Sequence, residues 1–185
     1  VLWLDIISRY RISTSGAPNF AYQYCIDKVS DEQLASLDLS CWQQAFCGAE
    51  PVSAATLQAF SQRFASCGFA AAAFLPCYGM AEATLFISGN KPLNHSARLL
   101  ELDAAALQQG QVVEQANGGK TLVSCGYPAA GCSIKIVAPQ QRQVLGERQI
   151  GEIWLASPAL TPGYWQQAQL NAQVFNQQPL GEPAQ

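Results

Sequence analysis

The stretch SAATLQAFSQRFASCG, residues 53–68, decides the fold because it has the pattern of one amphipathic helix. Ser53 is a residue type that caps helix N-termini, and Gly68 suits the position just after a helix ends. The apolar residues with helical spacing are Leu57, Phe60, Phe64 and Cys67. Because this spacing places them on one face, the stretch predicts a helix that packs that face into a core.

The segments on both sides of this helix predict strands of a parallel sheet. Phe69–Leu75 is a continuous apolar run ended by Pro76, typical of a strand buried on both faces. Residues 37–49 hold one strand that leads into a glycine turn. Strand, helix and strand in succession form a βαβ unit, so the sequence indicates the α/β class. Ligands in such sheets bind beyond the carboxyl ends of the strands, so we expect CGAE (47–50) and CYGM (77–80) to face one crevice.

The chain before this unit predicts short helices and one strand. Leu2–Tyr10 has amphipathic helical spacing, and residues 12–20 read as a short strand into a loop. Ala21–Lys28 is expected to be helical. Ser30 with Gln33 three residues later is a capping-box signature for a further helix.

The chain changes character after residue 87. Residues 88–121 cluster Gly, Asn, Pro and Gln around one short helical pattern, LLELDAAALQQG (99–110), as expected of an insertion on the sheet's edge. From residue 122 onward, short alternating strands such as SIKIV (133–137) and EIWLAS (152–157) predict a β-rich unit. We therefore expect three parts: an α/β part at 1–87, the insertion at 88–121, and part of a β-rich, barrel-like subdomain at 122–185.

The composition excludes several classes of function. The net charge is −3 and no basic run occurs, which disfavours binding to nucleic acid or to anionic lipid. No apolar stretch reaches the roughly 20 residues that a membrane-spanning helix needs. Apolar residues make up 49% and charged residues only 12%, about half the usual charged share of roughly a quarter. We therefore expect part of this surface to be covered in a longer protein.

The cysteines indicate a reducing compartment. The chain has seven cysteines, an odd number, with no C-x-x-C pair and a single histidine. This pattern disfavours a disulfide framework, and it disfavours zinc, which needs about four closely spaced ligands. We expect reduced, mostly buried thiols and a cytoplasmic protein.

Two motifs of other enzyme classes are incomplete. NGGKT (117–121) resembles the end of a phosphate-binding P-loop, but Glu114 stands where that loop needs glycine, which favours a solvated turn. No G-x-G-x-x-G dinucleotide motif and no G-x-S-x-G nucleophile motif occurs. A nucleophilic pair of Cys77 with His95 stays open, although a lone histidine in a polar segment is usually solvated.

The stretch LPCYGMAEATLF (75–86) offers groups suited to a nucleotide. The flat ring of Tyr78 can stack on a purine, and Gly79 allows close approach to the backbone. Glu82, one turn on in a predicted helix start, can bind a hard cation such as Mg²⁺. Taken singly, Tyr78 is better explained as a core aromatic residue, and Glu82 as a favourable acid in a first helical turn.

Three motifs in order carry a family resemblance: GAEPV (48–52), YGMAEATL (78–85) and GEIWLASPALTPGYW (151–165). Together they resemble the adenylate-forming superfamily of acyl-CoA synthetases and adenylation domains. Four further stretches resemble its fatty acyl-AMP ligase branch: APNFAY (17–22), LDLSCWQQAFCGAEPV (37–52), LPCYGMAEATLF and LVSCG (122–126). In that branch an insertion follows the Tyr-Gly motif, where residues 88–121 stand.

The resemblance implies a definite reaction with ATP and Mg²⁺. A fatty acid carboxylate attacks the α-phosphorus of ATP, releases pyrophosphate and leaves an acyl adenylate. The acyl group then passes to the phosphopantetheine thiol of an acyl carrier protein, in polyketide, lipopeptide or complex-lipid assembly. The resemblance covers essentially the whole chain, which corresponds to roughly a third of a complete family member.

The same resemblance implies the site residues. Tyr78 would stack on adenine, the 48–50 loop would line the opposite side of the base, and Glu82 would bind Mg²⁺. The implied nucleotide-binding residues are Gly48, Ala49, Glu50, Tyr78, Gly79, Met80 and Ala81. The implied walls of the acyl pocket are Asn19, Phe20, Gly79 and Met80. The aromatic residues Trp154, Tyr164 and Trp165 are assigned mainly to packing.

The sequence also departs from the family pattern. Ala81 stands where many relatives carry a threonine, although alanine is usual in the fatty acyl-AMP ligase branch. Nothing resembles the upstream phosphate loop, the downstream ribose motif or the small C-terminal domain with its lysine. We therefore expect this stretch alone to be catalytically inert.

Two alternatives stay open. One is a CoA-forming acyl synthetase or an amino-acid adenylation domain, disfavoured if apolar contacts through Leu99, Leu100 and Leu102 pin the insertion and hinder domain rotation. The other is a non-catalytic module that binds acyl chains or a partner through exposed apolar surface.

Overall fold

The computed structural model describes residues 2–90 and 96–181 and divides into two compact units. Unit 1 comprises Val1–Tyr78, Ser88–Leu100 and Thr121–Tyr127. Unit 2 comprises Gly79–Ile87, Glu101–Lys120 and Pro128–Gln185. The expected three-part division into 1–87, 88–121 and 122–185 stays a prediction.

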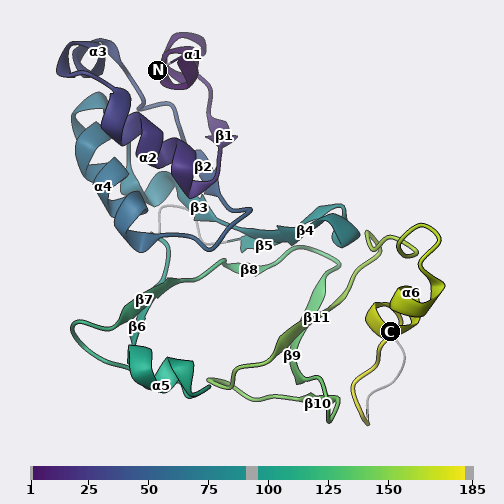
Figure 1. The fold of residues 1–185 in the computed structure, drawn as a ribbon. Helices are drawn as coiled ribbons and strands as arrows, with labels where there is room; N and C mark the ends of the chain where they lie inside the picture. The colour runs from purple at the N-terminus through teal and green to yellow at the C-terminus, as the bar shows by residue number, and fades with distance from the viewer. Residues whose placement is uncertain (1, 91–95, 182–185) are drawn as a thin grey trace. The chain divides into compact units, whose positions relative to one another are not determined.

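The N-terminal part of unit 1 is a three-stranded parallel sheet with helices (Figure 1). Its helices are α1 (Leu2–Tyr10), α2 (Asn19–Lys28), α3 (Asp31–Ser36) and α4 (Ala54–Phe64), with 3₁₀ turns η1 (Ala65–Cys67) and η2 (Ala71–Ala73). Its strands are β1 (Thr14–Gly16), β2 (Gln44–Cys47) and β3 (Phe74–Pro76), in the order β1-β2-β3. Both outer strands run parallel to β2, which confirms the predicted α/β class.

The helix predicted from residues 53–68 is confirmed. The Ser53 side chain accepts a hydrogen bond from the Thr56 backbone N–H at 3.2 Å. Gly68 ends the helical segment in the left-handed conformation at φ 82°, where a side chain would be strained. All four residues of the predicted apolar face are buried. The capping box is confirmed as well, with Ser30 and Gln33 exchanging hydrogen bonds of 3.0 and 3.2 Å.

The strand predicted over residues 69–75 is shorter than expected. Residues 71–73 form a 3₁₀ turn, and only Phe74–Pro76 pairs with β2. The turn consists of three alanines, which favour helical backbone and lack the branched side chains that fit a pleated sheet. Within the run only Phe69, Ala73 and Phe74 are buried, while Ala70 and Ala71 are exposed. The prediction of a fully buried strand is therefore wrong for the first part of the run.

An aromatic core joins the helices of unit 1 to its sheet. Figure 1 shows α2 and α4 side by side. Tyr22 of α2 and Phe60 of α4 meet edge to face with ring centroids 5.1 Å apart, and both contact Phe74 of β3. Trp42 completes the cluster and is almost fully buried. Because the buried Tyr22 hydroxyl donates to the Phe46 carbonyl at 2.8 Å, its polar atom is satisfied.

After β3 the chain forms shorter elements. The strands are β4 (Tyr78–Met80), β5 (Leu85–Asn90), β6 (Leu99–Leu102), β7 (Lys120–Val123), β8 (Tyr127–Pro128), β9 (Ser133–Ala138), β10 (Gln143–Val144) and β11 (Glu152–Ala156). The helical segments are η3 (Ala81–Ala83), α5 (Ala104–Gln108) and α6 (Ala168–Val174). The strands form sheets in the orders β4-β5-β8, β6-β7 and β10-β9-β11.

The β-rich character predicted after residue 122 is confirmed, with β9 and β11 at the predicted positions and antiparallel. Among the described residues none of these sheets closes into a barrel. The helical pattern predicted over 99–110 is correct only for α5, since Leu99–Leu102 is strand β6. Within that strand Leu102 is buried while Leu99 and Leu100 are exposed, so the apolar contacts expected of Leu99 and Leu100 are not supported.

All seven cysteines are free thiols, but only Cys25, Cys47 and Cys67 are buried and the other four are half-buried, so the expectation of mostly buried thiols is wrong. Within residues 2–90 and 96–181, no helix has both the length and the apolar character to cross a membrane.

Candidate functional site

The loops after β2 and β3 meet at one edge of the parallel sheet, as predicted. The Cys77 backbone N–H donates to the Cys47 carbonyl at 2.8 Å. Gly48 is buried, and a Cβ there would lie 2.8 Å from both the carbonyl oxygen and Sγ of Cys77. Only glycine allows the two loops to approach this closely, so Gly48 fixes their contact.

The first turn of α2 holds the 47–53 loop. The Asn19 side-chain amide donates to the Pro51 carbonyl at 2.8 Å, and its Oδ1 accepts from the Ser53 backbone N–H at 2.9 Å. The Cys47 thiol also lies 3.5 Å from Asn19 Oδ1. One residue on, the Phe20 backbone N–H donates to Glu50 Oε1 at 3.4 Å. The sequence did not indicate this link between two of its motifs, because its partners lie in distant stretches.

The predicted site residues of this loop differ in exposure. Ala49 and Glu50 are exposed, and Ala49 adopts a left-handed conformation at φ 66°. Asn19 is half-buried, whereas the Phe20 ring is 69% exposed. Tyr78, which belongs to the same unit as this loop, is half-buried. Unit 1 therefore holds all four residues predicted to line a nucleotide base, Gly48, Ala49, Glu50 and Tyr78.

Gly79 is required by the backbone of the neighbouring strand. A Cβ on Gly79 would lie 1.9 Å from the Leu85 carbonyl oxygen, far inside van der Waals contact. The close approach predicted for this glycine is therefore made by β5 itself. Met80 beside it is half-buried and Ala81 is exposed.

The helix predicted to start near Glu82 is wrong. Ala81–Ala83 form a single 3₁₀ turn, after which Thr84 and Leu85 adopt left-handed conformations at φ 52° and 82°. Such residues end a right-handed helix, so the chain turns directly into β5. Glu82 thus lies in a tight turn between two strands, where its side chain is half-buried.

The segment 159–164 holds this turn by three hydrogen bonds. The Thr161 backbone N–H donates to the Glu82 carbonyl at 2.7 Å, and Thr84 Oγ1 donates to the Ala159 carbonyl at 2.9 Å. The Tyr164 hydroxyl donates to Glu82 Oε1. This last bond lowers the pKa of Glu82 and raises the pKa of Tyr164, because it stabilises the carboxylate together with the neutral phenol.

The packing role predicted for three aromatic residues is only partly correct. The Tyr164 ring contacts Phe175 with centroids 5.3 Å apart, but its hydroxyl reaches Glu82, which sequence reasoning missed. Trp154 is half-buried, and its indole N–H donates to Glu152 Oε2 at 2.8 Å. Trp165 is 86% exposed and does not pack within the described chain. No sequence spacing signals a hydrogen bond between residues so far apart.

Glu82 fits one kind of metal site. Among the described residues, no group of three or more His, Cys, Asp or Glu side chains could hold a metal ion. Mg²⁺ is commonly bound by only one or two carboxylates, with phosphate oxygens and waters completing its shell. A single ionised carboxylate suits a cation that arrives with a nucleotide, whereas a closed protein site would need more ligands.

The other motifs gain no support as catalytic groups. Gly118 and Gly119 lie in a turn before β7, and Glu114 forms an ion pair with Arg148 at 2.6 Å. His95, the proposed partner of Cys77, lies outside the described residues. Burial raises the pKa of the Cys77 thiol, which disfavours the thiolate that a nucleophile needs.

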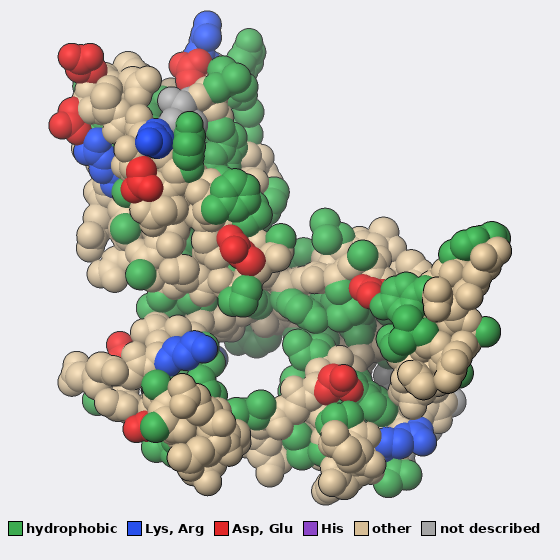
Figure 2. Space-filling model, in the orientation of Figure 1, with side chains coloured by type: hydrophobic (Ala, Val, Ile, Leu, Met, Phe, Trp, Pro, Cys, Tyr) green, Lys and Arg blue, Asp and Glu red, His purple; other side chains and the backbone are tan. Residues whose placement is uncertain are grey.

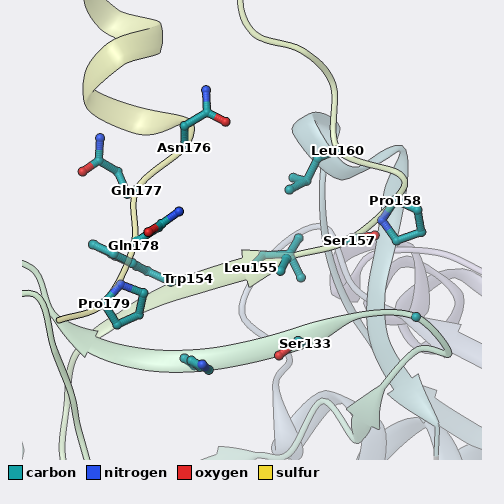
Figure 3. Close-up of a pocket in the computed structure, with 13 residues that line it drawn as sticks. Ser133, Trp154, Leu155, Ser157, Pro158, Leu160, Asn176, Gln177, Gln178 and Pro179 are labelled. Carbon is teal, nitrogen blue, oxygen red and sulfur yellow. The ribbon is translucent and has the colours of Figure 1, made fainter. Parts of the chain in front are cut away.

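A cavity of about 580 Å³ lies elsewhere in unit 2 (Figure 3). Strands β9 and β11 form its wall through residues such as Ser133, Trp154 and Leu155, and residues 176–179 run alongside them. None of the predicted site residues lines this cavity. The predicted site therefore consists of loop and turn surfaces outside this hollow.

Comparison with known proteins gives a consistent result. Residues 1–165 match the family described as AMP-binding enzyme. The chain is 43% identical over 171 residues to the medium-chain-fatty-acid–[acyl-carrier-protein] ligase TtuA of Teredinibacter turnerae. The matched region covers 91% of this chain and 26% of that relative.

Two solved structures from Legionella pneumophila share the fold. One is a fatty acid AMP ligase, with a TM-score of 0.92 and 38% identity over 99% of this chain and 32% of that one. The other is a fatty acyl-adenylate ligase in complex with acyl adenylate and pyrophosphate, with a TM-score of 0.87 and 40% identity. The match covers 93% of this chain and 30% of that one. The chain thus spans no more than a third of these three proteins.

Proposed function

The chain belongs to the AMP-binding enzyme family, and on this premise we propose that it is part of a fatty acyl-AMP ligase. The complete protein would activate a fatty acid with ATP and pass the acyl group to an acyl carrier protein. The similarity to the fatty acyl-adenylate ligase solved with acyl adenylate and pyrophosphate is the observation that carries this proposal. The free thiols suit a reducing cytoplasm, where we place the protein.

The base of the nucleotide is assigned to unit 1. Tyr78 stacks on adenine, and the loop of Gly48, Ala49 and Glu50 lines the other side of the ring. Support comes from the contact of this loop with Cys77, directly before Tyr78, and from the Asn19 bonds that hold its shape. Because stacking gains most on a fixed platform, a rigid loop favours binding.

The metal-binding role is assigned to Glu82. Its carboxylate is ionised at neutral pH, since the Tyr164 hydroxyl lowers its pKa. Bound Mg²⁺ would neutralise charge on the phosphate oxygens of ATP. Gly79, Met80 and Ala81 complete the nucleotide-binding stretch between the stacking residue and this carboxylate.

The role of contacting the acyl chain is assigned on each unit separately. It falls to Asn19 and Phe20 in unit 1, and to Gly79 and Met80 in unit 2. The exposed ring of Phe20 offers the kind of apolar surface that an alkyl chain covers. Asn19 contributes through the loop it holds, since both atoms of its amide are already hydrogen-bonded.

Two steps follow from these assignments. A carboxylate oxygen of the fatty acid bonds to the α-phosphorus of ATP as the bond to pyrophosphate breaks. The phosphopantetheine thiol of the carrier protein then attacks the acyl carbon, loses its proton and releases AMP. The residues of this chain bind and orient the nucleotide, and the present stretch alone is expected to give no turnover.

The test uses the complete protein with ATP, Mg²⁺ and fatty acids of increasing length. Pyrophosphate release is followed first, and CoA or a phosphopantetheinylated carrier protein is then offered as acceptor. We expect pyrophosphate with medium or long acids and transfer to the carrier protein but not to CoA. Efficient thioester formation with CoA would instead assign a CoA-forming synthetase, and the absence of pyrophosphate with every acid would leave a binding module.

A further inference from the structure

Tyr164 contacts three residues, Asn171, Phe175 and Glu82. The contacts with the first two fix its backbone and ring, and so place its hydroxyl for the bond to Glu82. Its backbone N–H donates to Asn171 Oδ1 at 2.7 Å, and its carbonyl accepts from Asn171 Nδ2 at 2.9 Å. Its ring meets Phe175 edge to face. With the backbone and ring so fixed, the hydroxyl donates to Glu82 Oε1.

The partner of this hydroxyl is itself held in place. Glu82 lies in a one-turn 3₁₀ segment whose carbonyl is bonded to Thr161, while Thr84 is bonded to Ala159. Donor and acceptor therefore belong to two segments joined by backbone bonds. The remaining freedom of Glu82 is rotation of its side chain, and the Tyr164 hydroxyl restricts that rotation by engaging one of the two oxygens.

We propose that Tyr164 is a positioning residue that orients the Glu82 carboxylate for a divalent cation. The inference rests on the proposed metal-binding role of Glu82. A hydroxyl that engages Oε1 fixes the orientation of the carboxylate and so sets the direction in which Oε2 points. Hydrogen bonds of this kind to a ligating carboxylate typically change metal affinity or activity by about 10–100-fold when they are removed.

The test measures metal binding without turnover. The complete protein is mixed with Mn²⁺ and the non-hydrolysable analogue α,β-methylene-ATP, and free Mn²⁺ is read from its electron paramagnetic resonance signal. Tyr164→Phe removes only the hydroxyl, since the ring can still contact Phe175. We expect Mn²⁺ to bind about tenfold more weakly than in the wild type, with the melting temperature little changed. Glu82→Gln lacks the charge of the proposed ligand, so its Mn²⁺ affinity gives the loss expected when the ligand itself is removed.

Two controls separate positioning from packing. Phe175→Leu removes the ring contact but keeps the hydroxyl, so it should lower the melting temperature and leave Mn²⁺ affinity within twofold of the wild type. Tyr10→Phe removes a hydroxyl from the exposed face of α1 and should change neither quantity. If Tyr164→Phe fails to fold, Asn171→Ala tests the same point by loosening the backbone of Tyr164, and Mn²⁺ should again bind more weakly.

The proposal is overturned if Tyr164→Phe binds Mn²⁺ as tightly as the wild type while Glu82→Gln binds it weakly. It is also overturned if Phe175→Leu weakens Mn²⁺ binding as much as Tyr164→Phe, because packing would then explain both. Failure of the proposed function has a different signature, since the wild-type protein would then release no pyrophosphate with any fatty acid.

Discussion

The two units of the chain are stabilised in different ways. In unit 1 sixteen of the described residues are buried and form one continuous core, rich in aromatic side chains. Among the described residues of unit 2, only Ala83, Ile87, Leu102 and Val137 are buried apolar side chains. Figure 2 shows many apolar side chains on the surface of the chain, including exposed residues of both units.

This difference coincides with a division of the proposed site. The residues assigned to the nucleotide base lie on unit 1, whose loops rest on the packed core. The carboxylate assigned to the metal lies on unit 2, in a turn fixed by hydrogen bonds from residues 159–164. We infer that base binding depends on apolar packing and that the metal-binding turn depends on a few polar contacts.

The largest effect is expected from opening the core of unit 1. Phe60 is fully buried and contacts five aromatic rings, so Phe60→Ala should cost about 3–5 kcal/mol of unfolding free energy. Urea denaturation of the complete protein, followed by tryptophan fluorescence, measures this loss. Tyr24→Ala, at a position that is 55% exposed, is the control and should stay within about 0.5 kcal/mol. Equal losses for the two variants would contradict the claim that the core stabilises unit 1.

A smaller effect is expected from separating β4 from β5. Gly79→Ala would place a methyl group 1.9 Å from the Leu85 carbonyl, and forcing the strands apart should cost about 1–3 kcal/mol. Melting of the complete protein checks this, with a lowered melting temperature expected. Gly146→Ala is the matched control, because its nearest neighbour to an added Cβ is a glutamine side chain at 3.6 Å. An unchanged melting temperature of Gly79→Ala would contradict the claim that the contact between β4 and β5 requires glycine there.

The sequence could predict elements whose signals are local. The helix over α4 was predicted from its capping serine, its apolar face and its terminal glycine, and each of these three features is present. The capping box of Ser30 was predicted for the same reason. The run of alanines before Phe74 was misassigned because its apolar composition suggested a buried strand. In the structure Ala70 and Ala71 are exposed, and residues 71–73 form a 3₁₀ turn.

The sequence could not predict contacts between distant stretches. Asn19 and Glu82 were identified as site residues from motifs, yet the bonds that hold the 47–53 loop and the Glu82 turn involve partners far along the chain. The prediction of a helix at Glu82 is wrong because two non-glycine residues after it have positive φ. The residue types at these positions do not indicate that conformation. Contacts with the surrounding structure hold such residues in this conformation, and these contacts can be identified only in the folded chain.

The smallest of these effects is expected from loosening the base-side loop without opening the core. Asn19→Ala removes the bonds to Pro51 and Ser53, and AMP affinity should fall about tenfold, equal to about 1.4 kcal/mol. Isothermal titration of the complete protein with AMP measures this change. Gln23→Ala, which removes an exposed amide bonded to Asp27 on the same helix, is the control and should leave AMP binding unchanged. Unaltered AMP affinity in Asn19→Ala would mean that the loop needs no such support.

The most direct test of the division between base and metal is a double comparison of binding in the complete protein. AMP without metal and α,β-methylene-ATP with Mg²⁺ are titrated into the wild type, Tyr78→Ala and Glu82→Gln. We predict that Tyr78→Ala weakens metal-free AMP binding about tenfold or more, since base stacking is worth about 1–3 kcal/mol. Glu82→Gln should leave AMP binding within twofold and weaken only binding of the analogue with Mg²⁺. If Glu82→Gln weakens metal-free AMP binding as strongly as Tyr78→Ala does, or if Tyr78→Ala has no effect, the proposed division is contradicted.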